Sequence, residues 1–206
     1  EVVCKKYNCS FPVELNLIGK HNILNTLAAI GIACELDIKV ETIQAALKDF
    51  SGVARRLDYH GFLKINNQRV TLFDDYGHHP NEIKAVFESL QNTYKNKRLV
   101  VVFQPHRYTR TRDLFDDFSQ ALSQADALVL LDIYPASEQP IAHINSSALA
   151  SSIRQRSSLD PIVVKDTLEV LDILPNVIKD DDVVLTLGAG DIHTLVELLT
   201  TQYADS

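Results

Sequence analysis

Apolar and polar positions change their spacing along the chain, and this change predicts its elements. Short apolar runs rich in valine, isoleucine and leucine predict buried strands, which lie at 99–103, 127–131, 162–164 and 183–187. Between them apolar residues recur at helical spacing, which predicts helices at 81–94, 114–125, 146–156, 167–177 and 192–200. Apolar strands that alternate with helices are typical of a parallel sheet covered on both faces. This part of the chain is therefore predicted to be an α/β domain.

Ahead of this alternation the pattern predicts a hairpin and, before it, a short helical region. Residues 57–63 and 68–73 are expected to form two strands joined by a turn at Asn66-Asn67. Residues 1–17 show short apolar alternations typical of strand ends from an incomplete sheet. Helices are expected at 23–34 and 40–50, the second with Ile43, Ala46, Leu47 and Phe50 facing inward. We place a domain boundary after residue 52, which leaves 1–52 as an incomplete domain and 53–206 as a complete one.

Composition narrows the class of protein. The chain has 206 residues and a net charge of -7, which argues against a nucleic-acid-binding surface. Its three cysteines, Cys4, Cys9 and Cys34, have no metal-ligand spacing with histidine and are expected to be free thiols in a reducing cytoplasm. The chain begins with glutamate and contains no methionine, so we expect it to be a piece of a longer protein.

The loop at 74–80, which follows a predicted strand, contains many side chains that can bind a ligand. In parallel sheets, ligands bind beyond the carboxyl ends of the strands, so such loops are the first candidates for a site. Its sequence DDYGHHP holds two acids, a phenol and two imidazoles, which can bind hydroxyls, amines or a metal. The alternative is a polar connection in which an aspartate caps the next helix and the histidines are solvated.

The loop at 104–112 follows the next strand and has the sequence QPHRYTRTR. Its three arginines, Arg107, Arg110 and Arg112, lie where a helix is expected to begin. Guanidinium groups and a helix N-terminus both favour anions, so this loop is a candidate site for a carboxylate or phosphate. The alternative is an exposed basic loop whose arginines pair with Asp113, Asp116 and Asp117.

Three further features carry weaker signals. The loop Gly188-Ala189-Gly190-Asp191 lacks both common phosphate-binding patterns, so close packing and a helix cap at Asp191 are expected there. Asn22 and Asn25 lie about one helical turn apart, where paired amides could read the edge of a base; simple N-capping by Asn22 is the alternative. Arg55 and Arg56 lie at the proposed boundary, within reach of a bound nucleotide or merely solvated.

In this order, the motifs resemble the Mur ligase family, and within it the branch that adds L-alanine. The matching segments are GKHNILN at 19–25, GVARRLD at 52–58, DDYGHHP at 74–80, VVVFQPHRYTRTRDLFDDF at 100–118 and LTLGAGDI at 185–192. The resemblance implies that 1–52 is the helical end of a central ATPase domain and 53–206 a Rossmann-type, dinucleotide-binding-like C-terminal domain. No GxxxxGK[ST] phosphate loop is present, so the chain is expected to be inactive alone.

The resemblance also implies the activity. It is an ATP-dependent, ADP-forming ligation of L-alanine to UDP-N-acetylmuramate through an acyl phosphate, in peptidoglycan precursor synthesis in the bacterial cytoplasm. Mg²⁺ would be required, with its ligands mostly outside this chain and no metal site within it. Two alternatives stay open: a stand-alone amino-acid- or nucleotide-binding module without catalysis, and a fragment of the related tripeptide-recycling ligase.

Site residues are implied in the same way, by position in the motifs. The family's adenine-edge residues match His21, Asn22 and Asn25, its boundary arginine matches Arg56, and its ribose-binding acid matches Asp75. The positions around the incoming L-alanine match Tyr76, His106, Arg107 and Arg110, and the last three of these are also the expected catalytic residues. Since Arg107 and Arg110 are three apart, both guanidinium groups could face one small anion from a first helical turn.

Overall fold

Two compact units make up the chain. The computed structural model describes residues 1–4 and 9–204, and residue contacts divide the chain into Glu1–Val53 (unit 1) and Ala54–Ser206 (unit 2). The identity of unit 1 as the end of a central domain stays a prediction. Among the described residues, no helix is both long enough and apolar enough to cross a membrane.

Unit 1 holds a two-stranded antiparallel sheet and two helices. Strands β1 (Val2–Cys4) and β2 (Cys9–Phe11) pair with each other, and helices α1 (Lys20–Glu35) and α2 (Val40–Asp49) follow. The small core consists of Phe11, Ile30, Cys34 and Ile43. The side chains of Cys4 and Cys9, expected to be free thiols, lie outside the described residues.

Both helices of unit 1 differ in detail from the prediction. Helix α1 begins at Lys20, so residues expected to form a turn lie in its first helical turn. On α2, Ile43 is buried as expected, but Ala46 is exposed and Phe50, just past the helix, is 43% exposed. The prediction that Ala46 and Phe50 face inward is therefore wrong. Helical spacing shows which residues share a face of a helix, but not how much of that face another element covers.

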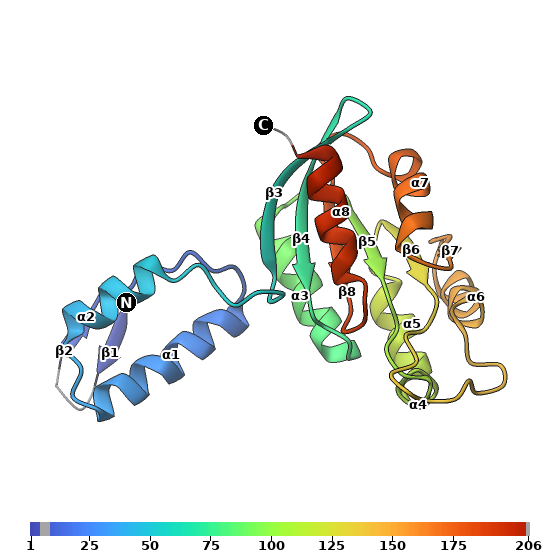
Figure 1. Ribbon diagram of the computed structural model, residues 1–206. Helices are drawn as coiled ribbons and strands as arrows, with labels where there is room; N and C mark the ends of the chain where they lie inside the picture. Colours follow the sequence, from blue (N-terminus) through green and yellow to red (C-terminus); the bar gives the residue numbers. More distant parts are fainter. Residues whose placement is uncertain (5–8, 205–206) are drawn as a thin grey trace. The chain divides into compact units, whose positions relative to one another are not determined.

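Unit 2 is built on a six-stranded sheet of order β3-β4-β8-β5-β6-β7 (Figure 1). Strands β3 (Asp58–Ile65) and β4 (Gln68–Asp75) form an antiparallel hairpin. Its turn residues Asn66 and Asn67 have φ of 49° and 65°, the left-handed pair that a tight hairpin turn requires and asparagine tolerates. The other strands are parallel to β4: β5 (Leu99–Phe103), β6 (Ala127–Leu131), β7 (Ile162–Val164) and β8 (Val183–Leu187).

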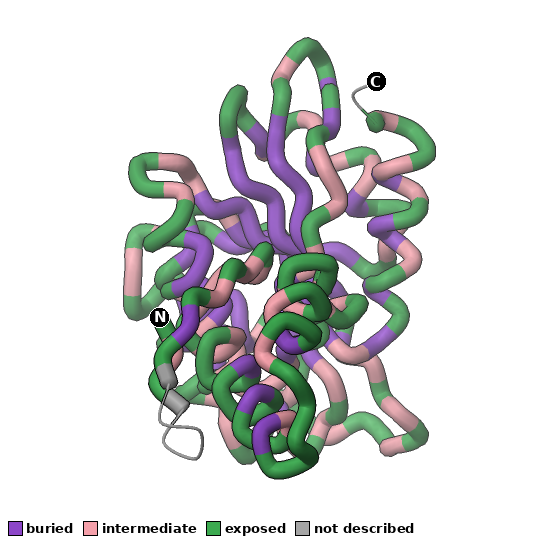
Figure 2. Tube along the Cα trace, turned by 90° about the vertical axis from the view of Figure 1, so that its left-hand side faces the viewer, coloured by how far each residue is buried: buried purple, intermediate pink, exposed green. Residues whose placement is uncertain are grey.

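Helices cover both faces of this sheet. Helices α3 (Pro80–Thr93), α5 (Phe115–Leu122) and α6 (Ser146–Arg156) pack against one another on one face. Helices α7 (Thr167–Val177) and α8 (His193–Tyr203) lie together on the other (Figure 1). Every residue of β5 and β8 is buried, and Figure 2 shows burial concentrated along the strands. The predicted α/β fold, with a mostly parallel sheet covered on both faces, is confirmed.

The bounds of β5, β6, β7 and β8 are those that the apolar runs predict. The helix expected at 114–125 is present as α5, but a short helix that was not predicted, α4 (Tyr108–Asp113), precedes it, and Leu114 separates the two. The arginine loop is thus partly helical. Periodicity missed α4 because its six residues include three charged ones and no apolar stripe.

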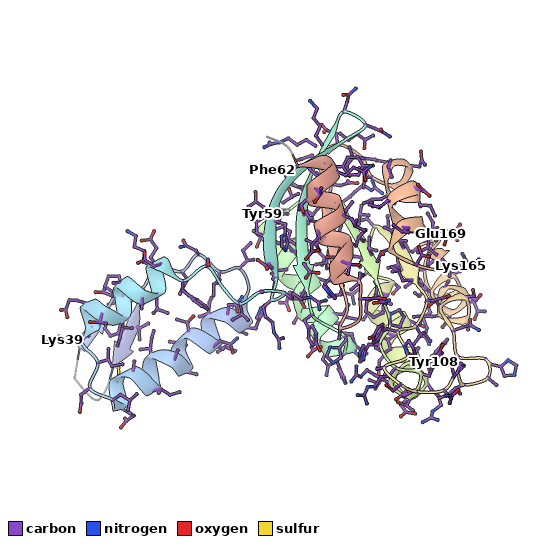
Figure 3. The ribbon with its side chains drawn as sticks, viewed as in Figure 1. Lys39, Tyr59, Phe62, Tyr108, Lys165 and Glu169 are labelled. Carbon is purple, nitrogen blue, oxygen red and sulfur yellow. The ribbon has the colours of Figure 1, made fainter. Side chains whose placement is uncertain are left out.

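The edge strand β3 carries two aromatic side chains, Tyr59 and Phe62 (Figure 3), which are 51% and 38% exposed. Their rings meet edge to face, with centroids 6.2 Å apart, and the Arg69 guanidinium lies 3.6 Å from the centroid of the Phe62 ring. The pairing register shifts between Tyr59 and Phe62. Such an irregularity and a nearby charge both disfavour pairing of an edge strand with another chain.

Candidate functional site

Loops from four adjacent strands meet at the carboxyl edge of the sheet. Strands β4, β8, β5 and β6 are consecutive neighbours and parallel, so the segments that follow them emerge at the same edge. These segments include the three loops that the sequence singled out, at 74–80, 104–112 and 188–191. The fourth, after β6, was not predicted to take part.

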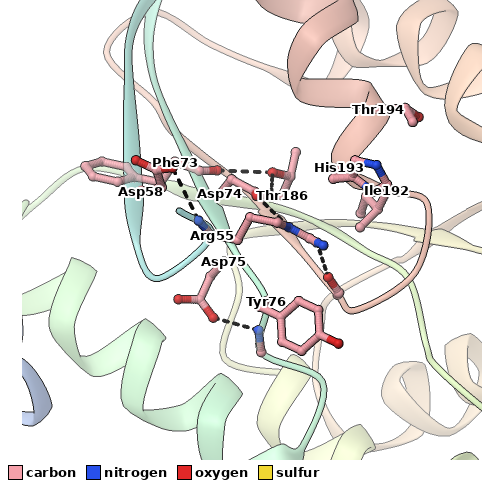
Figure 4. A network of polar contacts seen from close by, with 12 residues as sticks. Arg55, Asp58, Phe73, Asp74, Asp75, Tyr76, Thr186, Ile192, His193 and Thr194 are labelled. Carbon is pink, nitrogen blue, oxygen red and sulfur yellow. Dashed lines mark hydrogen bonds and ion pairs between the residues drawn. The ribbon is translucent and has the colours of Figure 1, made fainter. Parts of the chain in front are cut away.

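Asp74 lies at the centre of a buried polar network (Figure 4). Its Oδ2 accepts from Arg55 Nε at 3.0 Å, and its Oδ1 accepts from the Thr186 hydroxyl at 2.6 Å. The same guanidinium donates to the Gly188 carbonyl and lies 5.0 Å from the centroid of the Tyr76 ring. Arg55 is therefore committed to holding the loops after β4 and β8 together, and solvation is not its role.

Asp75 is also buried, and both of its oxygens already have partners. Oδ2 accepts from the Leu57 N–H and Oδ1 from the Gly77 N–H, each at 2.7 Å. Burial raises the pKa of Asp75 to about 6, against the opposing effects of these two bonds and of the Arg56 charge. Each carboxylate oxygen retains a second lone pair, so a further hydroxyl contact is chemically open, though the first contacts of Asp75 are with its own chain.

Arg56, the expected boundary arginine, is exposed. No hydrogen bond or ion pair occupies its guanidinium among the described residues, while its charge is close enough to lower the pKa of Asp75. The two neighbouring arginines thus differ: Arg55 is bound within unit 2, and Arg56 remains available to an anionic ligand.

Four rings form a continuous row across the edge. The Tyr76 and His78 rings meet edge to face with centroids 5.2 Å apart, and the His78 and His106 rings lie 5.9 Å apart. The His106 imidazole in turn stacks on Tyr134 at 5.4 Å with an interplanar angle of 13°. The structure therefore brings Tyr76 and His106 together, as predicted residues of one site, through His78.

His79 has a separate task at the start of α3. Its Nδ1 accepts from the Asn81 N–H at 3.3 Å, and the Glu82 carboxylate accepts from the N–H groups of His78 and His79. The helix is therefore capped by a histidine, and the alternative in which an aspartate caps it is wrong. Pro80 at the first helical position fixes the residue before it in an extended conformation, which suits a cap.

Arg107 and Arg110 flank the ring row. Arg110 lies on α4, and its guanidinium is 3.4 Å from His106 Nδ1. Arg107 is the exposed N-cap residue of α4, with φ of 73°. The expectation that both occupy one helical turn is therefore wrong for Arg107, because its backbone is not helical. Among the described residues neither arginine forms an ion pair, while Arg112 pairs with Asp113 at 2.8 Å.

Charge and burial act together on His106. Burial lowers the pKa of its imidazole, and the positive charge of Arg110 lowers it further, with smaller effects from His78 and Arg107. A neutral imidazole keeps one nitrogen as an acceptor and one as a donor. The site thus combines two arginines, an uncharged imidazole and a phenol, a set that suits a small molecule with both a carboxylate and an amine.

The loop Gly188-Ala189-Gly190-Asp191 after β8 packs closely against Gln104, as the sequence predicted. A Cβ at Gly188 would lie 2.8 Å from the Gln104 carbonyl oxygen. Asp191, however, does not cap α8: its carboxylate accepts from Gln104 Nε2 at 2.6 Å. Gln104 Oε1 accepts from the Ile192 N–H at 3.1 Å. The buried amide of Gln104 therefore clamps the loops after β5 and β8 together.

In unit 1, the candidate amides lie at the start of α1. Asn22 and Asn25 are both on this helix, Asn22 partly buried and Asn25 exposed. Asn22 is not the N-cap, since that position is Gly19, and its Nδ2 donates to the Ile18 carbonyl at 2.8 Å. The capping alternative is therefore wrong. His21 lies on the same first turn and is partly buried.

Sequence reasoning missed Tyr134, His78, Gln104 and Glu138 as parts of this site. Tyr134 and Glu138 follow β6 in the segment DIYPASEQP, and the rule that loops after parallel strands carry function would have pointed there. His78 and Gln104 lie inside the loops that were singled out. Their neighbours could not be read from the sequence, because these contacts join residues more than 25 positions apart.

Comparisons with known proteins identify the family to which this sequence is similar. A family model described as "Mur ligase, glutamate ligase domain" matches residues 55–190. A UDP-N-acetylmuramate–L-alanine ligase of Vesicomyosocius okutanii is 70% identical over 203 residues, which cover 98% of this chain and 43% of that protein. Its namesake in Methylococcus capsulatus is 52% identical over 187 residues, covering 91% of this chain and 40% of that protein. This chain thus spans less than half the length of the curated relatives it matches.

Solved structures show the same fold. The crystal structure of UDP-N-acetylmuramate-alanine ligase MurC from Thermotoga maritima matches with a TM-score of 0.75 at 26% identity, covering 94% of this chain and 40% of that chain. A structure of MurF from Acinetobacter baumannii matches with a TM-score of 0.71 at 21% identity, covering 92% of this chain and 40% of that one, and it supports the fold alone. With the family model matching most of the residues, this chain belongs to the Mur ligase family.

Proposed function

We propose that this chain is the C-terminal part of an ATP-dependent ligase that joins L-alanine to UDP-N-acetylmuramate in peptidoglycan precursor synthesis. The observation that carries the proposal is the 70% identity to a relative with that name, over 98% of this chain. The site supports it: unpaired guanidinium groups, an imidazole of lowered pKa and a phenol gather at one edge of the sheet. These groups match an amino-acid substrate.

In the proposed site, L-alanine is held by Tyr76, His106, Arg107 and Arg110. The Arg110 guanidinium has no carboxylate partner among the described residues, and it is positioned beside His106. A substrate carboxylate would complete this pair through charge-assisted hydrogen bonds. The uncharged imidazole adds no positive charge beside the alanine ammonium group. That group loses a proton to solvent, and the amine then attacks the carbonyl carbon of the acyl phosphate. The amide forms, and phosphate leaves with the second proton. The contribution of these residues is orientation and charge stabilisation.

The proposed nucleotide contacts come from each unit separately. In unit 1 they are His21, Asn22 and Asn25 on the first two turns of α1. In unit 2 they are Arg56, whose guanidinium is available, and Asp75, whose oxygens keep one lone pair each. The internal bonds of Asp75 orient its carboxylate, so we propose that it reaches a ribose hydroxyl only while Leu57 and Gly77 hold it.

We further propose that unit 1 is the end of a larger ATPase domain, as its surface suggests. Helix α1 exposes large apolar side chains on several sides: Ile23 is 50%, Leu24 57% and Ile32 64% exposed. A helix that is apolar all round is normally covered by protein on all sides. The relatives have more than twice the length of this chain, so the missing cover is proposed to come from the remainder of the protein.

Mg²⁺, which the family uses with ATP, would be held by that remainder. Among residues 1–4 and 9–204, no group of three or more histidine, cysteine or acidic side chains is placed to hold a metal ion.

The proposal is tested by extending the chain to the length of its relatives, from the encoding reading frame. We expect an upstream Gly-Lys-Thr phosphate loop, and ADP release that requires both L-alanine and UDP-N-acetylmuramate. The chain alone is expected to release no ADP with all three substrates. A start codon directly before Glu1, with L-alanine or nucleotide binding by calorimetry, would instead support a stand-alone binding module. Activity with a tripeptide but not with L-alanine would point to the recycling ligase.

A further inference from the structure

The loop after β6 contacts the loop after β5 on both sides of His106. The backbone N–H of Tyr134 donates to the Pro105 carbonyl at 2.8 Å, and its carbonyl accepts from the Arg107 N–H, also at 2.8 Å. Between these two bonds the Tyr134 ring stacks on the His106 imidazole. One residue thus fixes the backbone before His106, the backbone after it, and one face of its ring.

Tyr134 is itself packed against the glycine loop after β8. A Cβ added to Gly190 would lie 2.8 Å from both Cβ and Cγ of Tyr134, closer than real side chains approach. Glycine at this position therefore lets the β8 loop come up against the tyrosine. The Tyr134 side chain lies between that loop and His106, so it has little freedom to take another rotamer.

Glu138 ties the same loop to the first turn of α4. Its carboxylate accepts from the Thr109 N–H at 2.9 Å and from the Thr109 hydroxyl at 2.6 Å. These bonds, the hydroxyl first, lower the pKa of Glu138. Helix α4 needs such a partner because its N-cap residue, Arg107, offers no side-chain cap.

The turn between Tyr134 and Glu138 is strained, which indicates that its shape is imposed from outside. Ala136 and Ser137 have φ of 46° and 70°, in the left-handed region, and the Glu138 N–H donates to the Pro135 carbonyl at 2.9 Å to close the turn. Neither residue is a glycine, and such conformations persist only where the surroundings hold them. The bonds to Pro105, Arg107 and Thr109 provide that hold.

We propose that Tyr134 is a positioning residue for the amino-acid substrate: it holds the His106 imidazole beside Arg110, with Glu138 anchoring its turn to α4. This inference rests on the proposed function, in which His106 and Arg110 bind L-alanine. Without the tyrosine ring, His106 would lose the surface it stacks on and gain other rotamers. The imidazole and the guanidinium would then no longer be presented together to a carboxylate.

The first test reads His106 directly, in the 206-residue chain, by NMR titration of the histidine ring signals. The His106 signal is assigned from its loss in the His106→Gln spectrum. Burial is the main cause of the lowered pKa of His106, with Arg110, His78 and Arg107 adding to it and Glu138 opposing it. In Tyr134→Leu we expect this pKa to rise towards the ordinary value, and in Tyr134→Phe, which keeps the ring, to stay low. An unchanged pKa in Tyr134→Leu, with the chain folded, would overturn the proposal.

The second test reads the substrate, in the ligase extended to the length of its relatives. Loss of one stacked pair is expected to raise the KM for L-alanine about threefold to tenfold in Tyr134→Leu, while the KM for ATP stays within about twofold. Tyr134→Phe should rescue the KM. Glu138→Gln, which keeps one acceptor oxygen for Thr109, should have a smaller effect in the same direction. Equal increases in both KM values would mark a general folding defect and contradict the positioning role.

The two tests separate this inference from the proposed function. If the extended wild-type protein releases no ADP in an L-alanine-dependent manner, the ligase proposal fails, and the NMR titration still decides whether Tyr134 positions His106. If the ligase is active but the titration and the KM of Tyr134→Leu match the wild type, the positioning role alone is refuted.

Discussion

Asp75→Asn should change how the stability of unit 2 depends on pH. The pKa of Asp75 is raised from 3.8 to about 6 because its carboxyl group is buried. The folded chain therefore holds this proton more tightly than the unfolded chain does. The stabilising contribution of the group is fully present below the unfolded pKa and is lost as pH rises through the folded pKa. A displacement of about two pKa units corresponds to about 3 kcal/mol.

The prediction concerns a difference between two proteins, so other titrating groups cancel. Asparagine cannot ionise, so the free energy of unfolding of the wild type minus that of Asp75→Asn should fall by about 2 kcal/mol between pH 4 and pH 7, because part of the contribution is already lost at pH 4. Native-state amide exchange of Val101 and Leu185 measures this, because both are fully buried in central strands and report the opening of unit 2 alone. A ¹³C titration of the Asp75 carboxyl gives its pKa independently.

The control is Asp58→Asn, the same chemical change at a neighbouring carboxylate whose side chain is 31% exposed. Because this carboxyl group is more exposed than that of Asp75, the comparison isolates the effect of burial. If the difference for Asp75→Asn were flat from pH 4 to pH 7, burial would not govern this carboxyl group. If the stability difference instead rose with pH, the hydrogen bonds from the Leu57 and Gly77 N–H groups would outweigh the effect of burial on the pKa of Asp75.

Three further substitutions test the packing and the chemistry of the site. Gly190→Ala would place a Cβ in collision with Gln104 Oε1 and should lower the free energy of unfolding by about 1–3 kcal/mol, measured by thermal melting. Gly31→Ala, on a helix with nothing within 4 Å, is the matched control and should be neutral or stabilising; equal losses would contradict the packing explanation. Gln104→Leu leaves the Asp191 carboxylate without its donor and should cost about 1–3 kcal/mol in urea unfolding; an unchanged midpoint would show that the clamp contributes nothing. In the extended ligase, Arg110→Ala should raise the KM for L-alanine by about tenfold or more and that for ATP far less, and an equal effect on both would remove it from the amino-acid site.

The sequence by itself determined the framework of unit 2. Apolar runs such as 99–103 and 183–187 give strands with the predicted bounds, because a strand buried on both faces is almost continuously apolar and the apolar run stops where the strand ends. Asn66-Asn67 determined the hairpin turn through the tolerance of asparagine for left-handed backbone. The motifs at 74–80 and 104–112 also predicted which loops form the candidate site, since loops after parallel strands emerge at one edge.

Only the tertiary structure decided which contacts each side chain of those loops makes. Two adjacent acids look alike in sequence, yet Asp74 pairs with Arg55 and Asp75 holds Leu57 and Gly77. Tyr134 became part of the site only when the parallel order of β5 and β6 placed it against His106. These contacts join distant positions, and local pattern carries information about an element's own faces but none about its neighbours across the sheet. Strand order, which pattern does not encode, set the partners.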